Sequence, residues 1–235
     1  MPSQTFAEGA LDAAQQTGKL SYDGYKKVWS DEFNGDSLNR ADWNVETHEK
    51  GWVNNELQEY VDSAENIQVK DGKLIINPVK KVTDGGTGSI KEATYYTSGR
   101  VSTQNKQTFT YGRFECRAKV PKGQGYLPAF WLMANDENVY GQWPRCGEID
   151  CMEVMGQETN KAYGTLHYGN PHSQSQGTYT ITDGADFSDD FHIYTCDWEP
   201  GKITWYVDGV KYHEESEWHS TTVGQGTLAY PAPFD

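Results

Sequence analysis

Hydrophobic and polar residues alternate along much of this chain with the period of two that is typical of β-strands. Residues 95–102 and 111–120 follow the alternation and predict strands of antiparallel sheets. Residues 66–76 predict a hairpin that turns at an Asp-Gly dipeptide. Residues 191–210 predict two further turns, at Glu-Pro-Gly and Asp-Gly, between alternating strands. The pattern therefore predicts an all-β protein.

Residues 147–156 depart from simple alternation because they hold three carboxylates within six residues. Successive side chains of a strand point to opposite faces, so Glu148 and Asp150 share one face and Glu153 falls on the other. One extra residue at Cys151 or Met152 would form a β-bulge and return Glu153 to the face of Glu148. We therefore predict a bulged strand with three carboxylates on one face.

Like charges crowded on one face repel each other and are costly to desolvate, so a purely structural strand rarely collects them. A solvated edge strand with scattered acids is the plain alternative. Against it, Ile149, Val154 and Met155 indicate a strand with a buried face. We therefore expect these acids to carry chemistry.

The chemistry that uses such a set is glycoside hydrolysis with retention, which needs two carboxyl groups about 5–5.5 Å apart. We assign Glu148 as nucleophile and Glu153 as general acid and base, although spacing alone leaves the order of these roles open. Asp150 lies between them and is expected to share a proton with Glu148. The negative neighbours raise the pKa of the acid, so that it is protonated when substrate arrives.

Residues 143–153, Trp-Pro-Arg-Cys-Gly-Glu-Ile-Asp-Cys-Met-Glu, resemble the active-site signature of glycoside hydrolase family 16. That signature reads Glu, aliphatic, Asp, apolar, an optional apolar residue, Glu, and here Met152 is the optional residue. The resemblance implies Glu148 as nucleophile, Glu153 as acid/base and Asp150 as the assisting residue. In the family this bulged form is typical of laminarinases and marine galactan hydrolases, whereas bacterial lichenases usually lack it.

The same resemblance extends to residues that would bind substrate. Residues 54–60 resemble the family's loop beside the non-reducing subsites, which implies that Asn54 and Glu56 hydrogen-bond glucose hydroxyls. Trp131 and Trp143 are candidate platforms for sugar rings, because a flat indole covers the apolar face of a pyranose with little loss of entropy. The plain alternative for any single Trp is a position in the hydrophobic core. For a single His it is a structural position in which its hydrogen bonds are satisfied. His167 is implied to reach Glu153 and modulate its proton.

The opening motif at residues 25–35 resembles a segment whose acid can ligate a structural calcium ion. The matching groups would be Glu32 and the backbone carbonyl of Gly72, and an exposed Glu32 on an N-terminal strand is an equal alternative. We expect no cofactor for catalysis.

Composition narrows the class of partner. The 235 residues fit a single domain, and an aromatic content of 13% with 24 Gly suits a strand-and-turn protein. The formal charge of −14 argues against nucleic acid and disfavours an anionic polysaccharide.

No apolar run is long enough to span a membrane. Residues 1–24 lack the charged start and the apolar core of a signal peptide. We expect a secreted or extracellular protein, and its signal would then have been removed. The four cysteines are expected to be buried free thiols, with one disulfide possible.

The domain boundaries follow from where the resemblance begins and ends. Residues 1–24 are expected to form a tail or linker, and residues 25–235 a family 16-like catalytic domain. Members of the family continue past the Pro-Ala-Pro-Phe-Asp stretch, so the last strands are expected to be missing. Unpaired strands would leave backbone groups without partners. Either the sequence is a truncated record, or another chain or segment completes the sheet.

Together these observations predict a β-sandwich of jelly-roll type, similar to concanavalin A, with a concave substrate cleft. The expected activity is a retaining endo-β-glucanase acting on laminarin-like β-1,3-glucan, with mixed-linkage β-1,3-1,4-glucan close behind. The alternatives are a galactan hydrolase of the agarose type, a transglycosylase and a non-hydrolytic glucan-binding module. A binding module tends to lose catalytic acids, and this chain keeps all three.

Overall fold

A computed structural model describes residues 21–84 and 92–219 of the chain, and within these ranges every regular element is a β-strand. The chain divides into two compact units, one of residues 1–30 and 108–235 and the other of residues 31–107. Each unit is described by itself below. Most of the tail expected at residues 1–24, and the end of the chain from residue 220, lie outside the described residues.

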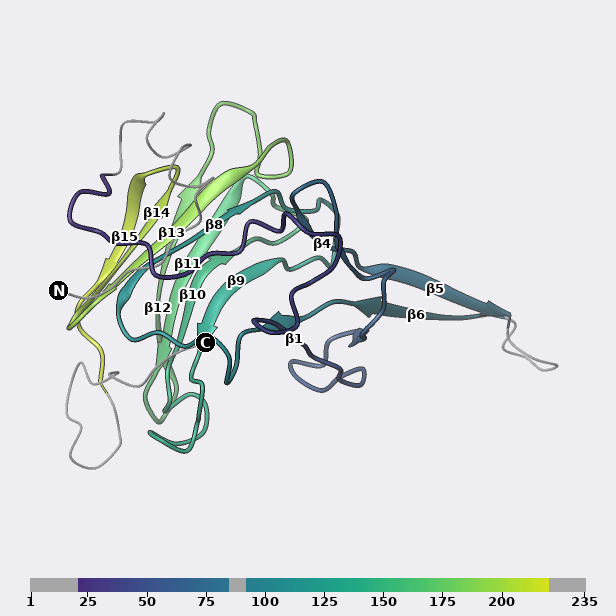
Figure 1. Ribbon diagram of the computed structural model, residues 1–235, viewed down its shortest axis with the longest axis horizontal. Helices are drawn as coiled ribbons and strands as arrows, with labels where there is room; N and C mark the ends of the chain where they lie inside the picture. The colour runs from purple at the N-terminus through teal and green to yellow at the C-terminus, as the bar shows by residue number, and fades with distance from the viewer. Residues whose placement is uncertain (1–20, 85–91, 220–235) are drawn as a thin grey trace. The chain divides into compact units, whose positions relative to one another are not determined.

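The first unit contains two four-stranded antiparallel sheets (Figure 1). Sheet A has the order β12-β11-β10-β9, and sheet B the order β15-β14-β13-β8. The strands of sheet A are β9 (Ala129–Met133), β10 (Glu148–Glu153), β11 (Lys161–Tyr168) and β12 (Ser173–Thr180). The strands of sheet B are β8 (Gly112–Ala118), β13 (His192–Glu199), β14 (Lys202–Val207) and β15 (Val210–Glu215).

A shared hydrophobic core joins the two sheets face to face. Sheet A contributes Ile149, Cys151 and Leu166, and sheet B contributes Trp198 and Trp205, all of them buried. Because strand side chains alternate, each strand that gives one face to this core presents the other face outward. The prediction of an all-β sandwich is confirmed.

The long hairpin of sheet B follows the sequence pattern closely. β13 and β14 pair from Tyr194 with Val207 to Glu199 with Lys202, around the Pro-Gly turn. β14 and β15 meet at Asp208 and Gly209, both with positive φ, 48° and 75°. Two successive positive φ values are those of the tight turn that suits the twist of a hairpin. The predicted turns of residues 191–210 are therefore confirmed.

The second unit contains three small sheets, two with two strands and one with three. β1 (Asn44–Val45) pairs with β7 (Val101–Ser102), and β3 (Ile67–Val69) pairs with β4 (Leu74–Ile76) as the predicted hairpin. β6 (Glu92–Ser98) lies between β2 (Gln58–Tyr60) and β5 (Val79–Asp84).

One expected strand of this unit is interrupted. The sequence predicts a continuous strand at 95–102, but β6 ends at Ser98 and β7 begins at Val101. A Cβ atom on Gly99 would lie 3.3 Å from the Asn66 carbonyl oxygen and would overlap the Ile67 side chain. Gly99 therefore marks a close packing contact at which the strand breaks.

Two further expectations concern the whole chain. All four cysteines, Cys116, Cys146, Cys151 and Cys196, are free thiols, as expected, and the last three are buried. Among the described residues, there is no helix with the length and apolar character needed to cross a bilayer.

Candidate active site

Strand β10, which contains the three acids, has the predicted bulge. On the β9 side, Asp150 pairs with Trp131 and Met152 with Phe130, so the register shifts by one residue between Asp150 and Met152. On the β11 side the same shift falls between Asp150 and Glu153. Both neighbouring strands therefore place one extra β10 residue after Asp150. The bulge that the spacing of the carboxylates predicted is confirmed.

The burial of β10 shows what the bulge does. Ile149 and Cys151 belong to one part of the core, and Met152 and Val154 to another, so two successive residues face inward. Glu148, Asp150 and Glu153 are left for the opposite face, outside the shared core. Without the extra residue, alternation would place Met152 on the outer face and Glu153 in the core. The bulge is the local feature that gathers the three acids.

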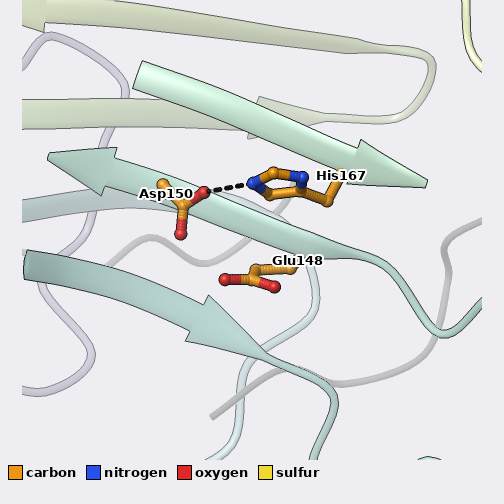
Figure 2. A group of neighbouring side chains, drawn as sticks. All are labelled: Glu148, Asp150 and His167. Atoms are coloured by element: carbon orange, nitrogen blue, oxygen red, sulfur yellow. Dashed lines mark ion pairs between the residues drawn. The ribbon is translucent and has the colours of Figure 1, made fainter. Parts of the chain in front are cut away.

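Figure 2 shows the centre of the site, where Glu148 and Asp150 of β10 lie beside His167 of β11. One ligand-type atom from each of the three lies within 4.8 Å of the other two. His167 Nε2 is 3.2 Å from Asp150 Oδ2, an ion-pair distance, yet this oxygen has no hydrogen-bond partner of good geometry. Asp150 is only 3% exposed. The site thus holds a buried carboxylate whose hydrogen-bonding capacity is not fully used.

His167 contacts a different acid from the one expected. The sequence analysis expected it to reach Glu153, but its register partner on β10 is Glu148 and its ion pair is with Asp150. The register partner of Glu153 is Tyr163. Burial and the charge of Glu148 raise the pKa of Glu153, and the charge of His167 opposes this rise.

All three carboxyl groups have raised pKa values. Burial, followed by the charge of Asp150, raises the pKa of Glu148 to about 7. Burial, followed by the charge of Glu153, raises the pKa of Asp150 to about 8. Burial and the charge of Glu148 also raise the pKa of Glu153. Desolvation favours the neutral form of each acid and mutual repulsion prevents all three from ionising together, so they titrate as a coupled set.

Trp143 contacts this group directly. Its indole Nε1 donates a hydrogen bond to Glu148 Oε2 at 2.5 Å, and its side chain is 45% exposed. The bond stabilises the ionised form of Glu148 and lowers its pKa against the effect of burial. Trp143 is thus placed beside the predicted nucleophile with much of its ring facing solvent. Its role as a sugar platform remains a prediction.

Trp131 shares the outer face of sheet A with the acids. It is the register partner of Asp150 on β9, and directly paired residues of antiparallel strands point to the same side. The ring is partly buried. This position suits a platform at the carboxylates, and that role also remains a prediction.

His172 is a site residue that the sequence did not predict. Its Nε2 lies 2.9 Å from Nδ1 of His167, and the two rings stack with centroids 5.1 Å apart. The Trp143 ring centroid is 5.0 Å from that of His172. His172 follows the Gly-Asn-Pro turn after β11, and no spacing rule pairs it with His167. Only the fold of the β11–β12 connection brings the two imidazoles together.

The other residues predicted to bind substrate, Asn54 and Glu56, lie in the second unit. Asn54 begins the turn before β2 with a positive φ of 51°. Glu56 Oε2 accepts hydrogen bonds from Gln58 Nε2 and from Tyr60 Oη, both at 3.0 Å. These bonds hold the Glu56 carboxylate in one orientation. Contacts of Asn54 and Glu56 with a glucose unit stay predictions.

The predicted calcium groups also belong to the second unit. Gly72 has a φ of +68° in the turn between β3 and β4, and a Cβ atom there would lie 4.0 Å from Asn34 Oδ1. The turn thus lies next to a side chain two positions after Glu32. In the first unit, Glu148, Asp150 and His167 could together offer one nitrogen and two oxygen ligands to a divalent cation.

Comparisons with known proteins identify the family. The model of glycosyl hydrolases family 16 matches residues 54–233, more than half of the chain. The chain belongs to this family. The prediction of family 16 is therefore confirmed, and with it the jelly-roll type of the β-sandwich.

Three members illustrate the similarity. A glucan endo-1,3-beta-glucosidase A1 of Niallia circulans is 39% identical over 90% of this chain and 32% of its own length. A glucan endo-1,3-beta-glucosidase of Cryptopygus antarcticus is 44% identical over 80% of this chain and 68% of its own length. The laminarinase catalytic domain of Thermotoga maritima superposes with a TM-score of 0.71 at 37% identity, covering 88% of this chain and 82% of that domain. The chain thus spans about a third of the first relative and two thirds of the second.

Proposed function

We propose that this chain is the catalytic domain of a retaining endo-β-glucanase that cleaves β-1,3-glucan of the laminarin type. The bulge in β10 is the observation that carries the proposal, because it collects three carboxylates on one face outside the core. Family 16 relatives that are glucan endo-1,3-β-glucosidases support the choice of substrate. Mixed-linkage β-1,3-1,4-glucan is the second candidate. Neutral glucan also agrees with the formal charge of −14.

The reaction follows from the protonation states of the three acids. Burial and the charges of neighbouring acids raise the pKa values of both Glu148 and Asp150, so the two carboxyls titrate as a pair that can share one proton. Burial and the charge of Glu148 raise the pKa of Glu153, which favours its protonated form. An ionised Glu148 beside a protonated Glu153 is the state that a retaining hydrolase needs before attack.

In the first step, Glu148 attacks the anomeric carbon and forms a covalent glycosyl ester while the glycosidic C–O bond breaks. Glu153 gives its proton to the departing sugar oxygen. In the second step, Glu153 takes a proton from water, whose oxygen attacks the anomeric carbon and releases Glu148. Trp143 and Asp150 act on Glu148 through hydrogen bonds, and the net configuration at carbon is retained.

The test compares laminarin, barley β-glucan and agarose in parallel, with reducing-sugar release and product sizes as readouts. Early release of short oligosaccharides from laminarin, with the β-anomer appearing first by proton NMR, is the expected result. Products longer than the substrate would indicate transglycosylation. Cleavage of agarose alone, or binding of glucan without cleavage, would contradict the proposal.

We also propose a structural calcium ion held by the Glu32 carboxylate and the Gly72 carbonyl. Both donors are oxygens, the type that calcium prefers, and the nearby Asn34 amide oxygen adds a third of the same type. The ion would stabilise the second unit and take no part in catalysis. Calorimetry should show a higher Tm with calcium than with EDTA, and Glu32→Gln should remove the difference. An equal Tm in both conditions would refute the site.

A further inference from the structure

The active-site strand receives a hydrogen bond from the opposite sheet. Trp205 of β14 is fully buried, and its indole Nε1 donates to the backbone carbonyl oxygen of Asp150 at 2.9 Å. The two residues are 55 positions apart in the chain and lie on different sheets of the sandwich. The bond therefore crosses the core and ends on the peptide at which the bulge begins.

The residue opposite the bulge leaves room for this indole. Thr165 pairs with Asp150 and Tyr163 pairs with Glu153, so Gly164 is the single β11 residue that faces the extra residue of β10. A Cβ atom on Gly164 would overlap Trp205 Cδ1 and the Tyr212 hydroxyl. The glycine is thus required by close approach of the indole to the sheet.

A second ring supports the first. His213 of β15 stacks on Trp205 with ring centroids 4.7 Å apart and an interplanar angle of 26°. The β12 partner of Gly164 is Gly177, where a Cβ atom would overlap the His213 side chain. Two paired glycines of sheet A therefore receive two stacked rings of sheet B. The indole has little freedom to tilt.

We propose that Trp205 is a positioning residue that sets the direction of the catalytic carboxylates by holding the bulge carbonyl of Asp150. A bulge disrupts the ladder of its strand, and a buried carbonyl without a donor is costly. The indole N–H supplies a donor in one fixed direction. It thereby fixes the peptide that joins Asp150 to Cys151, and with it the relative orientation of Glu148 and Glu153. This inference rests on the proposed hydrolase function.

The test uses Trp205→Phe, which keeps an aromatic ring and removes the N–H. The matched control is Trp198→Phe, an equally buried indole on the neighbouring strand and in the same core. Both variants should lower the Tm. We expect Trp205→Phe to reduce kcat on laminarin about tenfold with KM nearly unchanged, because small misplacements of reacting groups cost rate rather than binding. Trp198→Phe should keep kcat within about twofold of the wild type.

Gly164→Ala provides an independent variant, since it keeps the indole and displaces it. Circular dichroism checks that Gly164→Ala is folded. Its kcat and KM should then show the same selective loss of kcat as those of Trp205→Phe. If Trp205→Phe and Gly164→Ala lose stability but keep kcat, Trp205 is a packing residue and the inference is wrong.

A readout without turnover separates this inference from the proposed function. In the ¹⁵N-labelled wild-type protein, the indole N–H signal of Trp205 should shift with the ionisation of the active-site acids, and that of Trp198 should not. An unresponsive Trp205 signal would overturn the inference. A wild-type protein that cleaves no glucan but shows the coupled signal would overturn only the proposed function.

Discussion

Two groups of buried carboxylates lie on the two sheets of the first unit and differ in their partners. On sheet A, Asp150 is almost fully buried beside Glu148 and Glu153, with His167 as its ion-pair partner. On sheet B, Asp197 is equally buried but accepts two bonds from Arg113, at 2.6 Å from Nε and 2.7 Å from Nη2. The second arrangement is a bidentate pair of fixed opposite charges.

The rest of the sheet B group is satisfied as well. Arg113 Nη1 also donates to the Ser21 carbonyl at 2.8 Å, and the Tyr22 hydroxyl donates to Glu115 Oε1 at 2.9 Å. Thr195 donates to the same carboxylate at 3.1 Å. Residues 21 and 22, assigned from the sequence to a tail, are thus bonded to the sandwich. These contacts make the group a structural clamp for the incoming chain.

A raised pKa alone does not tell the two groups apart. Burial raises the pKa of Glu115 on sheet B to about 7, the same value that Glu148 reaches on sheet A. The two groups differ in the cations and hydrogen-bond donors that surround the carboxyl groups. Sheet B supplies a guanidinium and hydroxyl donors, whereas sheet A places acids against one another and leaves Asp150 Oδ2 without a hydrogen bond. A buried carboxyl group with an unused hydrogen-bonding oxygen, close to a partly exposed Trp, is an arrangement typical of catalytic sites.

The largest effect is expected from removing the reacting groups. Glu153→Gln should reduce laminarin turnover about 10²- to 10⁴-fold, the usual contribution of general acid and base catalysis. Glu148→Gln should reduce it further, because the covalent step is lost. Both variants should keep or raise the Tm, since each replaces a buried ionisable carboxyl of a mutually repelling set by a neutral amide. Initial rates and calorimetry give the two readouts.

The control for this pair is Glu158→Gln, a carboxylate outside β10 that is paired with Lys161 at 2.7 Å. It should retain wild-type turnover. Wild-type activity in either Glu148→Gln or Glu153→Gln would show that β10 is not the reacting strand.

On sheet B, we expect a substitution to lower stability and leave activity unchanged. Arg113→Met should lower the free energy of unfolding by about 3–5 kcal/mol, because it leaves the Asp197 charge buried without its partner. Any folded fraction should hydrolyse glucan at the normal rate per molecule. Urea unfolding followed by fluorescence measures the first quantity, and active-site titration the second.

The double variant Arg113→Met with Asp197→Leu refines this comparison. Removing both charges should recover much of the lost stability, since neither is then unpaired. A double variant no more stable than Arg113→Met would show that the clamp depends on the other bonds of Arg113 rather than on the ion pair.

The sequence predicted the acids of sheet A but not the ion pair of sheet B. The three acids and their bulge followed from a count, because Glu148 and Glu153 are an odd number of residues apart and a strand has period two. Arg113 and Asp197 are paired by a register between β8 and β13 that spans 84 positions, and no local pattern sets it. The bond from Trp205 to Asp150 depends likewise on how one sheet lies over the other. Alternation predicts which residues face inward, not which of them meet.

The third effect concerns pH. The raised pKa of Asp150 means that the folded protein binds a proton that the unfolded chain, with an ordinary Asp, releases near pH 4. Stability contributed by this protonated carboxyl is therefore full below about pH 4 and is lost as the pH rises toward about 8. Asp150→Asn cannot ionise, so its free energy of unfolding should fall less between pH 5 and pH 8 than that of the wild type.

The matched control is Asp183→Asn, which changes an exposed aspartate on the same unit. Its pH dependence should follow the wild type in urea unfolding series at the two pH values. Equal slopes for Asp150→Asn and the wild type would show that Asp150 is ionised in the folded protein, and the proton shared with Glu148 would then have to reside elsewhere.

The smallest effect is expected at the edge of the sheet A group. His172→Gln removes a ring whose Nε2 lies 2.9 Å from Nδ1 of His167, so we expect it to act on the acids only through His167. Losing one hydrogen bond of about 0.5–1.5 kcal/mol corresponds to a loss of roughly 2- to 10-fold in kcat if it acts fully in the transition state. The ring that holds His167 in one orientation should matter less than His167 itself. A pH–rate profile of His172→Gln beside His167→Gln measures this order, and a larger loss in His172→Gln would mean that His172 contacts the substrate directly.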